Sequence, residues 1–171
     1  MISLLSGAII AAALLFQPDA AQLSAFVAAL SVILVNSSWR LALRLGLFAL
    51  LLCCTVAAWR VPDPLAPVRY VEGVFRLAAE VSPVALLAAV VSAALPVLGL
   101  VAFARSTESN APLAVAAYYT TLFALAPFQV TPVPLLGFGF GPILGYFLAA
   151  SLVARSGARN TANPLPLSPD P

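Results

Sequence analysis

Residues 39–60, WRLALRLGLFALLLCCTVAAWR, decide the fold of this chain. Trp39 and Trp59 stand 20 positions apart, which is about 30 Å along an α-helix and equals the thickness of the hydrocarbon core of a bilayer. An arginine follows each tryptophan, and both residue types are typical of the membrane–water interface. The stretch therefore predicts a membrane-spanning helix over residues 39–59.

The composition extends this prediction to the whole chain. Of 171 residues, 63% are hydrophobic and 8% are charged, whereas soluble domains average about 45–50% and about 25%. An integral membrane protein that is all-α, with about six transmembrane helices in one polytopic domain over residues 1–154, fits these values. We expect the helices at 2–16, 20–35, 39–59, 81–104, 112–126 and 142–154, several of them short or tilted.

The same composition argues against several kinds of chemistry. The chain has no histidine, the commonest metal ligand and general base. Cys53 and Cys54 are adjacent inside an apolar run, where we expect small packing residues rather than metal ligands. The eight basic residues, all arginine, are too dispersed for a nucleic-acid surface. We expect no metal, no cofactor and no nucleic-acid partner.

The first two segments are short for spanning helices. Residues 2–16 lack a basic n-region, so we expect a retained membrane helix rather than a cleaved signal peptide. Residues 20–35 make about 24 Å of helix, less than the roughly 30 Å hydrocarbon core. The pair is predicted to form a tilted or shallow hairpin.

The only substantial connection between predicted helices is residues 60–80. It begins with several prolines, and charged residues follow them. Arg69, Glu72, Arg76 and Glu80 recur every three or four positions, a spacing that favours ion pairs on an amphipathic helix over residues 68–80. One interpretation is a connecting helix at the membrane interface with a solvated charged face. The other is a docking surface for a partner protein, with these four residues as candidates.

Hydroxyl groups cluster in the middle of the segment 112–126. Tyr118, Tyr119, Thr120 and Thr121 follow one another there, and each hydroxyl needs a partner inside a bilayer. Neighbouring helices, carbonyls of the same helix or a bound ligand are the available partners. We take Tyr118 and Thr121 as candidate binding residues.

Residues 127–142, PFQVTPVPLLGFGFGP, hold four prolines and three glycines and carry no charge, so they cannot form a continuous helix. One possibility is irregular backbone at membrane depth, as in the broken helices of transporters. The other is a tight external loop between longer helices. If the segment forms a binding surface, the candidates are Gln129, Thr131, Gly137, Gly139 and Gly141.

Arginine placement suggests an orientation. With six crossings, five arginines fall on the side of the N-terminus and three on the other, which predicts cytoplasmic N- and C-termini. The absence of lysine and the abundance of alanine and arginine suggest GC-rich coding and a bacterial cytoplasmic (inner) membrane. Residues 155–171 are expected to form a disordered tail.

Two functional classes fit these features best. Packing faces and a charged helix favour a non-catalytic small subunit, assembly factor or scaffold of a larger membrane complex, whose partners are the lipid bilayer and either another membrane protein or further copies of the chain. The alternative is a small-molecule transporter or substrate-binding membrane component with its site at the broken 127–141 segment. An enzyme is disfavoured, because no motif joins the six carboxylates.

Overall fold

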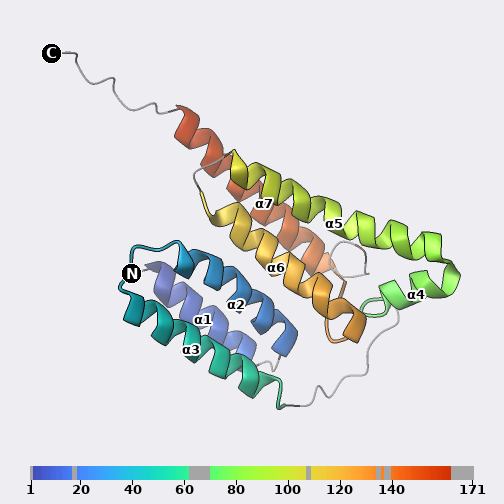
Figure 1. The fold of residues 1–171 in the computed structure, drawn as a ribbon, viewed down its shortest axis with the longest axis horizontal. Helices are drawn as coiled ribbons and strands as arrows, with labels where there is room; N and C mark the ends of the chain where they lie inside the picture. Colours follow the sequence, from blue (N-terminus) through green and yellow to red (C-terminus); the bar gives the residue numbers. More distant parts are fainter. Residues whose placement is uncertain are drawn as a thin grey trace.

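The computed structural model describes residues 2–16, 19–61, 70–106, 109–133, 136 and 140–162. Within these ranges the chain forms helices and turns and no β-strand, which confirms the all-α fold (Figure 1). The α-helices are α1 (Ile2–Phe16), α2 (Ala20–Val35), α3 (Leu41–Ala58), α4 (Val74–Val81), α5 (Pro83–Arg105), α6 (Ala111–Leu125) and α7 (Phe140–Ala162), and a 3-10 turn, η1 (Ala126–Phe128), extends α6.

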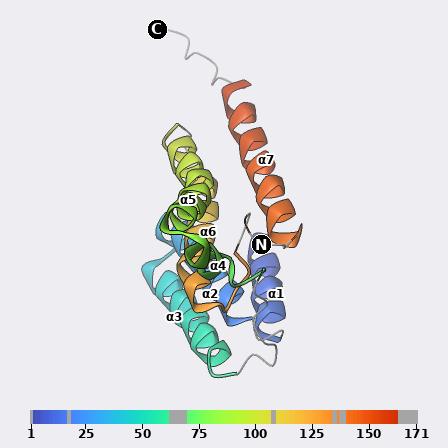
Figure 2. The same cartoon turned by 90° about the vertical axis from the view of Figure 1, so that its right-hand side faces the viewer.

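The helices form two groups that meet along their middle members. Helices α1, α2 and α3 pack together, and α4 and α5 pack beside α6 (Figure 1). The most extensive contact between described helices joins α2 to α6 and so connects the two groups. Helix α7 stands to one side of α5 and α6 and makes less contact with α6 than α2 does (Figure 2).

The first group has a small apolar core. Leu23 and Val27 of α2 are buried with Ala58 of α3, and Leu51 and Cys54 pack against them. Cys54 is thus a packing residue, as the sequence predicts, whereas Cys53, for which the sequence predicts the same role, is exposed. The core fixes α3 against the face of α2 that turns away from α6.

Two side-chain hydrogen bonds hold α3 to α2 at opposite ends. The indole Nε1 of Trp59 donates to Ser24 Oγ at 3.0 Å. The Nη1 of Arg44 donates to the carbonyl oxygen of Val35, the last residue of α2, at 2.9 Å. A cation at the carboxyl end of a helix also complements the helix dipole.

Local signals explain where the helices of the second group begin. Ser82 caps α5 by accepting a hydrogen bond from the Ala85 amide at 3.0 Å, and Pro83 occupies the first turn, where its missing N–H is harmless. Pro96 lies inside α5. Pro112 likewise lies in the first turn of α6.

Among the described residues, the buried apolar side chains are mostly small and the exposed ones mostly large, which is the reverse of the pattern in a soluble domain. More than half of the buried apolar residues are alanines, among them Ala21 and Ala25 of α2 and Ala114 of α6. The exposed apolar residues are mostly leucine, valine, isoleucine and phenylalanine on α1, α3, α5 and α7. Small residues let helix backbones approach closely, while lipid solvates large apolar side chains, so this distribution fits a membrane protein.

Within the described part of the chain, three helical segments are long and apolar enough to cross a membrane: Leu41–Ala58, Pro83–Arg105 and Ala111–Phe128. The sequence places spanning helices in these three regions, with boundaries that differ by a few residues. Helices α1 and α2, with 15 and 16 residues, are as short as the sequence predicts.

Two boundaries differ more. The predicted helix over 68–80 begins only at Val74, because residues 70–72 form a turn and the Val71 carbonyl accepts a hydrogen bond from the Val133 amide at 3.0 Å instead of serving a helix. The predicted tail from residue 155 is helical to Ala162. The helical stretch ends two residues before Pro164, and proline disfavours helical backbone at the residue before it.

The contact between α2 and α6 predicts a mutational effect. Ala25 is fully buried and lies on the same face of α2 as Gln22 and Ala29, which line the cleft beside α6. Ala25→Leu should therefore overpack the contact and destabilise the protein by about 1–3 kcal/mol. Thermal unfolding in mild detergent measures this effect, with Ala42→Leu on the exposed side of α3 as the matched control. Equal unfolding temperatures for the two variants would show that the contact tolerates a larger side chain and is wrongly described.

Candidate binding cleft

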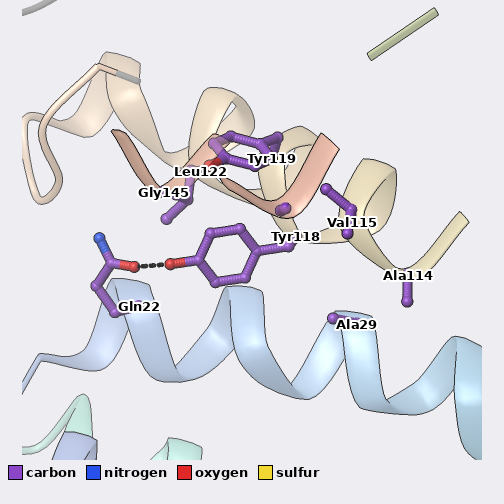
Figure 3. A pocket seen from close by; sticks show the side chains of 9 residues that line it. Gln22, Ala29, Ala114, Val115, Tyr118, Tyr119, Leu122 and Gly145 are labelled. Atoms are coloured by element: carbon purple, nitrogen blue, oxygen red, sulfur yellow. Dashed lines mark hydrogen bonds between the residues drawn. The ribbon is translucent and has the colours of Figure 1, made fainter. Parts of the chain in front are cut away.

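A cleft of about 520 Å³ lies between α2, α6 and α7. Its walls are mostly apolar, and its polar groups are one amide and two phenol hydroxyls (Figure 3). The lining residues are Gln22 and Ala29 of α2, Ala114, Val115, Tyr118, Tyr119 and Leu122 of α6, and Gly145 and Ala149 of α7. A volume of this size and an apolar wall with few polar groups are typical of small-molecule sites.

The central polar contact of the cleft joins the two helix groups. The hydroxyl of Tyr118 donates a hydrogen bond to Gln22 Oε1, and Figure 3 shows the Tyr118 ring lying between α2 and α6. Gln22 sits in the first turn of α2, where its backbone amide donates to Asp19 Oδ1 at 2.9 Å. The helix cap thereby fixes the backbone of Gln22, whose side-chain amide meets Tyr118.

The cleft is polar at one end and apolar along its length. Gln22 lies beside Tyr118, and Ala29, seven residues further along α2, lies opposite Ala114 (Figure 3). Seven residues of helix correspond to about 10 Å, so the cleft extends roughly this far from its polar end. The pairing also shows that α2 and α6 run antiparallel.

Aromatic contacts hold α7 against this site. The Tyr119 ring meets the rings of Tyr118 and Tyr146 edge to face, with centroids 5.3 and 5.2 Å apart. The Tyr146 hydroxyl donates to the Pro96 carbonyl oxygen of α5 at 3.3 Å. The first of these pairs lies within α6, whereas the Tyr119–Tyr146 pair joins α6 to α7 and contributes about 0.5–1.5 kcal/mol. This pair and the Tyr146 hydrogen bond help to position α7.

Small residues on α7 create the volume of the cleft. Gly145 and Ala149, four residues apart, suggest a face for close helix packing in the sequence. In the structure both line the cleft, and a Cβ added at Gly145 would meet only the Tyr119 hydroxyl, at 3.8 Å. The missing side chains therefore leave room beside α6.

The cleft contains one of the predicted binding residues, and the other described ones do not line it. Tyr118 lines the cleft, whereas the Thr121 hydroxyl donates to the Ala117 carbonyl of its own helix at 2.9 Å. Gln129 follows η1 with a left-handed backbone, φ 59°. Gly141 lies in the first turn of α7, and Gly137 and Gly139 lie outside the described residues.

Residues 127–133, 136 and 140–142 of the predicted broken segment are described. Residues 140–142 begin α7, while Val133 reaches back to the turn before α4. Thr131 and Val133 are each only 1% exposed, and the Val133 amide bonds to the Val71 carbonyl. The Thr131 hydroxyl points to the neighbouring Pro132 carbonyl at 3.4 Å. The charged connection and the Pro/Gly-rich segment therefore meet at one end of the molecule.

The structure describes three of the four predicted docking residues. Arg76 and Glu80 form an ion pair on α4, Nε to Oε1 3.4 Å, which confirms that predicted pair. Glu72 lies in the turn before α4, and Arg69 lies outside the described residues.

Gln22 is a residue of the cleft that the sequence patterns do not indicate. Its only signal is an amide side chain inside an otherwise apolar segment, and such a group needs a partner in a membrane. Within the described residues that partner is Tyr118, 96 positions away. The segment 20–35 by itself does not reveal this pairing.

Comparisons with known proteins give no assignment to a family. No family model, curated protein or solved structure matches the chain.

Proposed function

We propose that this protein is a non-catalytic membrane component that binds a small molecule in the cleft between α2, α6 and α7, as a transporter or as the substrate-binding part of a transport system. The observation that carries the proposal is the cleft itself, about 520 Å³ in volume, at the contact between the two helix groups. Transporters commonly place their substrate site between two helical units near the middle of the membrane.

The lining suggests the chemistry of the ligand. Alanine, valine and leucine side chains cover most of the wall, which favours an apolar body of drug-like size. Gln22 and Tyr118 bond to each other at the polar end and retain further hydrogen-bonding capacity, since a carboxamide has two donors and a phenol oxygen also accepts. A molecule with one carbonyl or hydroxyl group at the end of an apolar body fits these features.

The cleft does not lie at the Pro/Gly-rich segment where the sequence predicts a binding site. The sequence instead indicates residues 127–141, where Thr131 and Val133 are buried and the Val133 amide bonds to the Val71 carbonyl. Of the predicted binding residues, Tyr118 lines the cleft. The cleft is also lined by Gln22 and by the small residues Gly145 and Ala149 of α7.

The cleft predicts which substitutions release the ligand. Gly145→Leu should fill the cleft and remove molecules that co-purify with the wild-type protein, whereas Gly145→Ala, whose added Cβ makes an ordinary contact, should retain them. Tyr118→Phe removes the phenol oxygen that would accept a hydrogen bond from the ligand, about 1 kcal/mol, and should weaken retention about fivefold. Mass spectrometry of small molecules extracted from each purified variant measures the retention.

Thr121→Ala is the matched control for Tyr118→Phe, because the Thr121 hydroxyl bonds within α6. Identical extracts from the wild type and Gly145→Leu, at equal thermal stability, would overturn the cleft as the site.

A second candidate function rests on α4. All of its side chains are at least partly exposed, and the Arg76 and Glu80 side chains are 72% and 44% exposed. An exposed charged helix of this kind offers a docking surface to another membrane protein or to a second copy, as expected of a small subunit, assembly factor or scaffold.

Isolation from native membranes in mild detergent tests this second function. We expect a co-purifying protein or a defined oligomer, which Arg76→Glu weakens because it places three acidic residues, with Glu72 and Glu80, along one short stretch. Arg105→Glu, at the far end of α5, serves as the control. A homogeneous monomer with no co-purifying protein would contradict the subunit function.

For the arrangement in the membrane, we propose six crossings of a bacterial inner membrane with both termini in the cytoplasm. This orientation puts the turn at Glu72 outside and the turn at Ser109 inside. In a background with Cys53 and Cys54 replaced by alanine, an impermeant thiol reagent added to intact cells should label Glu72→Cys and spare Ser109→Cys. Labelling of both, or of Ser109→Cys alone, would contradict this topology.

A further inference from the structure

A second hollow, separate from the cleft, runs between α4, α5 and α6. It has a volume of about 640 Å³, and its lining is apolar except for Arg76 and Thr120. Phe75 and Ala79 of α4 lie at one end with Arg76, and α5 and α6 form its walls. We refer to this hollow as the α4 groove.

The length of the α4 groove matches one leaflet of a bilayer. On α5 its lining runs from Leu86 to Leu98, which are 12 positions apart, or about 18 Å of helix. Half of the roughly 30 Å hydrocarbon core is about 15 Å. Both walls belong to segments apolar and long enough to span the membrane, so lipid surrounds the groove.

The charge at the end of the α4 groove suits a phosphate. Arg76 lies on α4, which immediately precedes the first turn of α5. Its contact with Glu80 uses Nε, and the Arg76 side chain remains 72% exposed. A guanidinium group binds phosphate oxygens through several N–H donors and is weakly hydrated, which makes arginine a common phosphate ligand.

We propose that the α4 groove binds an anionic phospholipid, with an acyl chain along α5 and the phosphate at Arg76. A partner helix that crosses the membrane would need a complementary surface along its full depth. The groove instead ends at Val97 and Leu98, in the second half of α5. One acyl chain of one leaflet fills such a space and leaves its headgroup beside the cation.

Native mass spectrometry in detergent doped with phosphatidylglycerol tests this proposal. We expect one retained phosphatidylglycerol per wild-type chain and weaker retention of phosphatidylcholine. Arg76→Gln should reduce phosphatidylglycerol retention about fivefold to tenfold, because one cation–phosphate contact is lost. Glu80→Gln should raise retention, since it removes the carboxylate that competes for Arg76.

A tryptophan tests the groove wall. Val90→Trp places a large ring in the groove and should abolish retention of either lipid, whereas Leu87→Trp, on an exposed part of α5 outside the lining, should behave as the wild type. Equal phosphatidylglycerol retention in the wild type, Arg76→Gln and Val90→Trp would overturn the proposal. Loss of a co-purifying protein from Val90→Trp with lipid retention intact would also overturn it and identify the groove as a protein-docking site.

Discussion

Inside a bilayer an apolar side chain gains little by leaving lipid for protein, so helices associate through close packing of small residues and through polar bonds. In this chain that constraint acts most clearly where α2 meets α6. Ala25 and Ala114 let the two backbones approach, and Tyr118 donates its hydroxyl hydrogen to Gln22. Since α2 also carries α1 and α3, and α6 contacts α5 and α7, the whole arrangement depends on this contact.

Helix α6 lies between the cleft and the α4 groove and contributes to both. One of its faces presents Tyr118 and Leu122 to the cleft, and another presents Thr120 and Phe123 to the α4 groove. A ligand in the cleft and a lipid in the groove would therefore touch opposite sides of the same helix. The short η1 turn and the packed residues after it anchor the end of α6 that lies next to α4.

The regions of the three described segments that are long and apolar enough to cross a membrane were predictable, because length and hydrophobicity are local properties. The tryptophan-bracketed stretch 39–59 forms α3 with both ends trimmed. Pro83 and Pro112 lie in the first turns of α5 and α6, where proline is a local signal of a helix start. The start of α4 was not predictable in the same way. Its charge spacing extends back to Arg69, but the Val71 carbonyl is taken by Val133, a partner 62 positions away in the chain.

For the candidate site, the sequence located the cluster of hydroxyls on α6 and the small residues on α7, since both are visible within one segment. It did not reveal that Tyr118 and Gln22 meet, or that Gly145 borders a cleft. The sequence by itself thus determined the all-helical class and the segments suited to the membrane. The tertiary structure decided which polar groups meet and where space remains, because in an alanine-rich apolar chain many faces are equally able to pack. That choice depends on contacts between residues far apart in sequence.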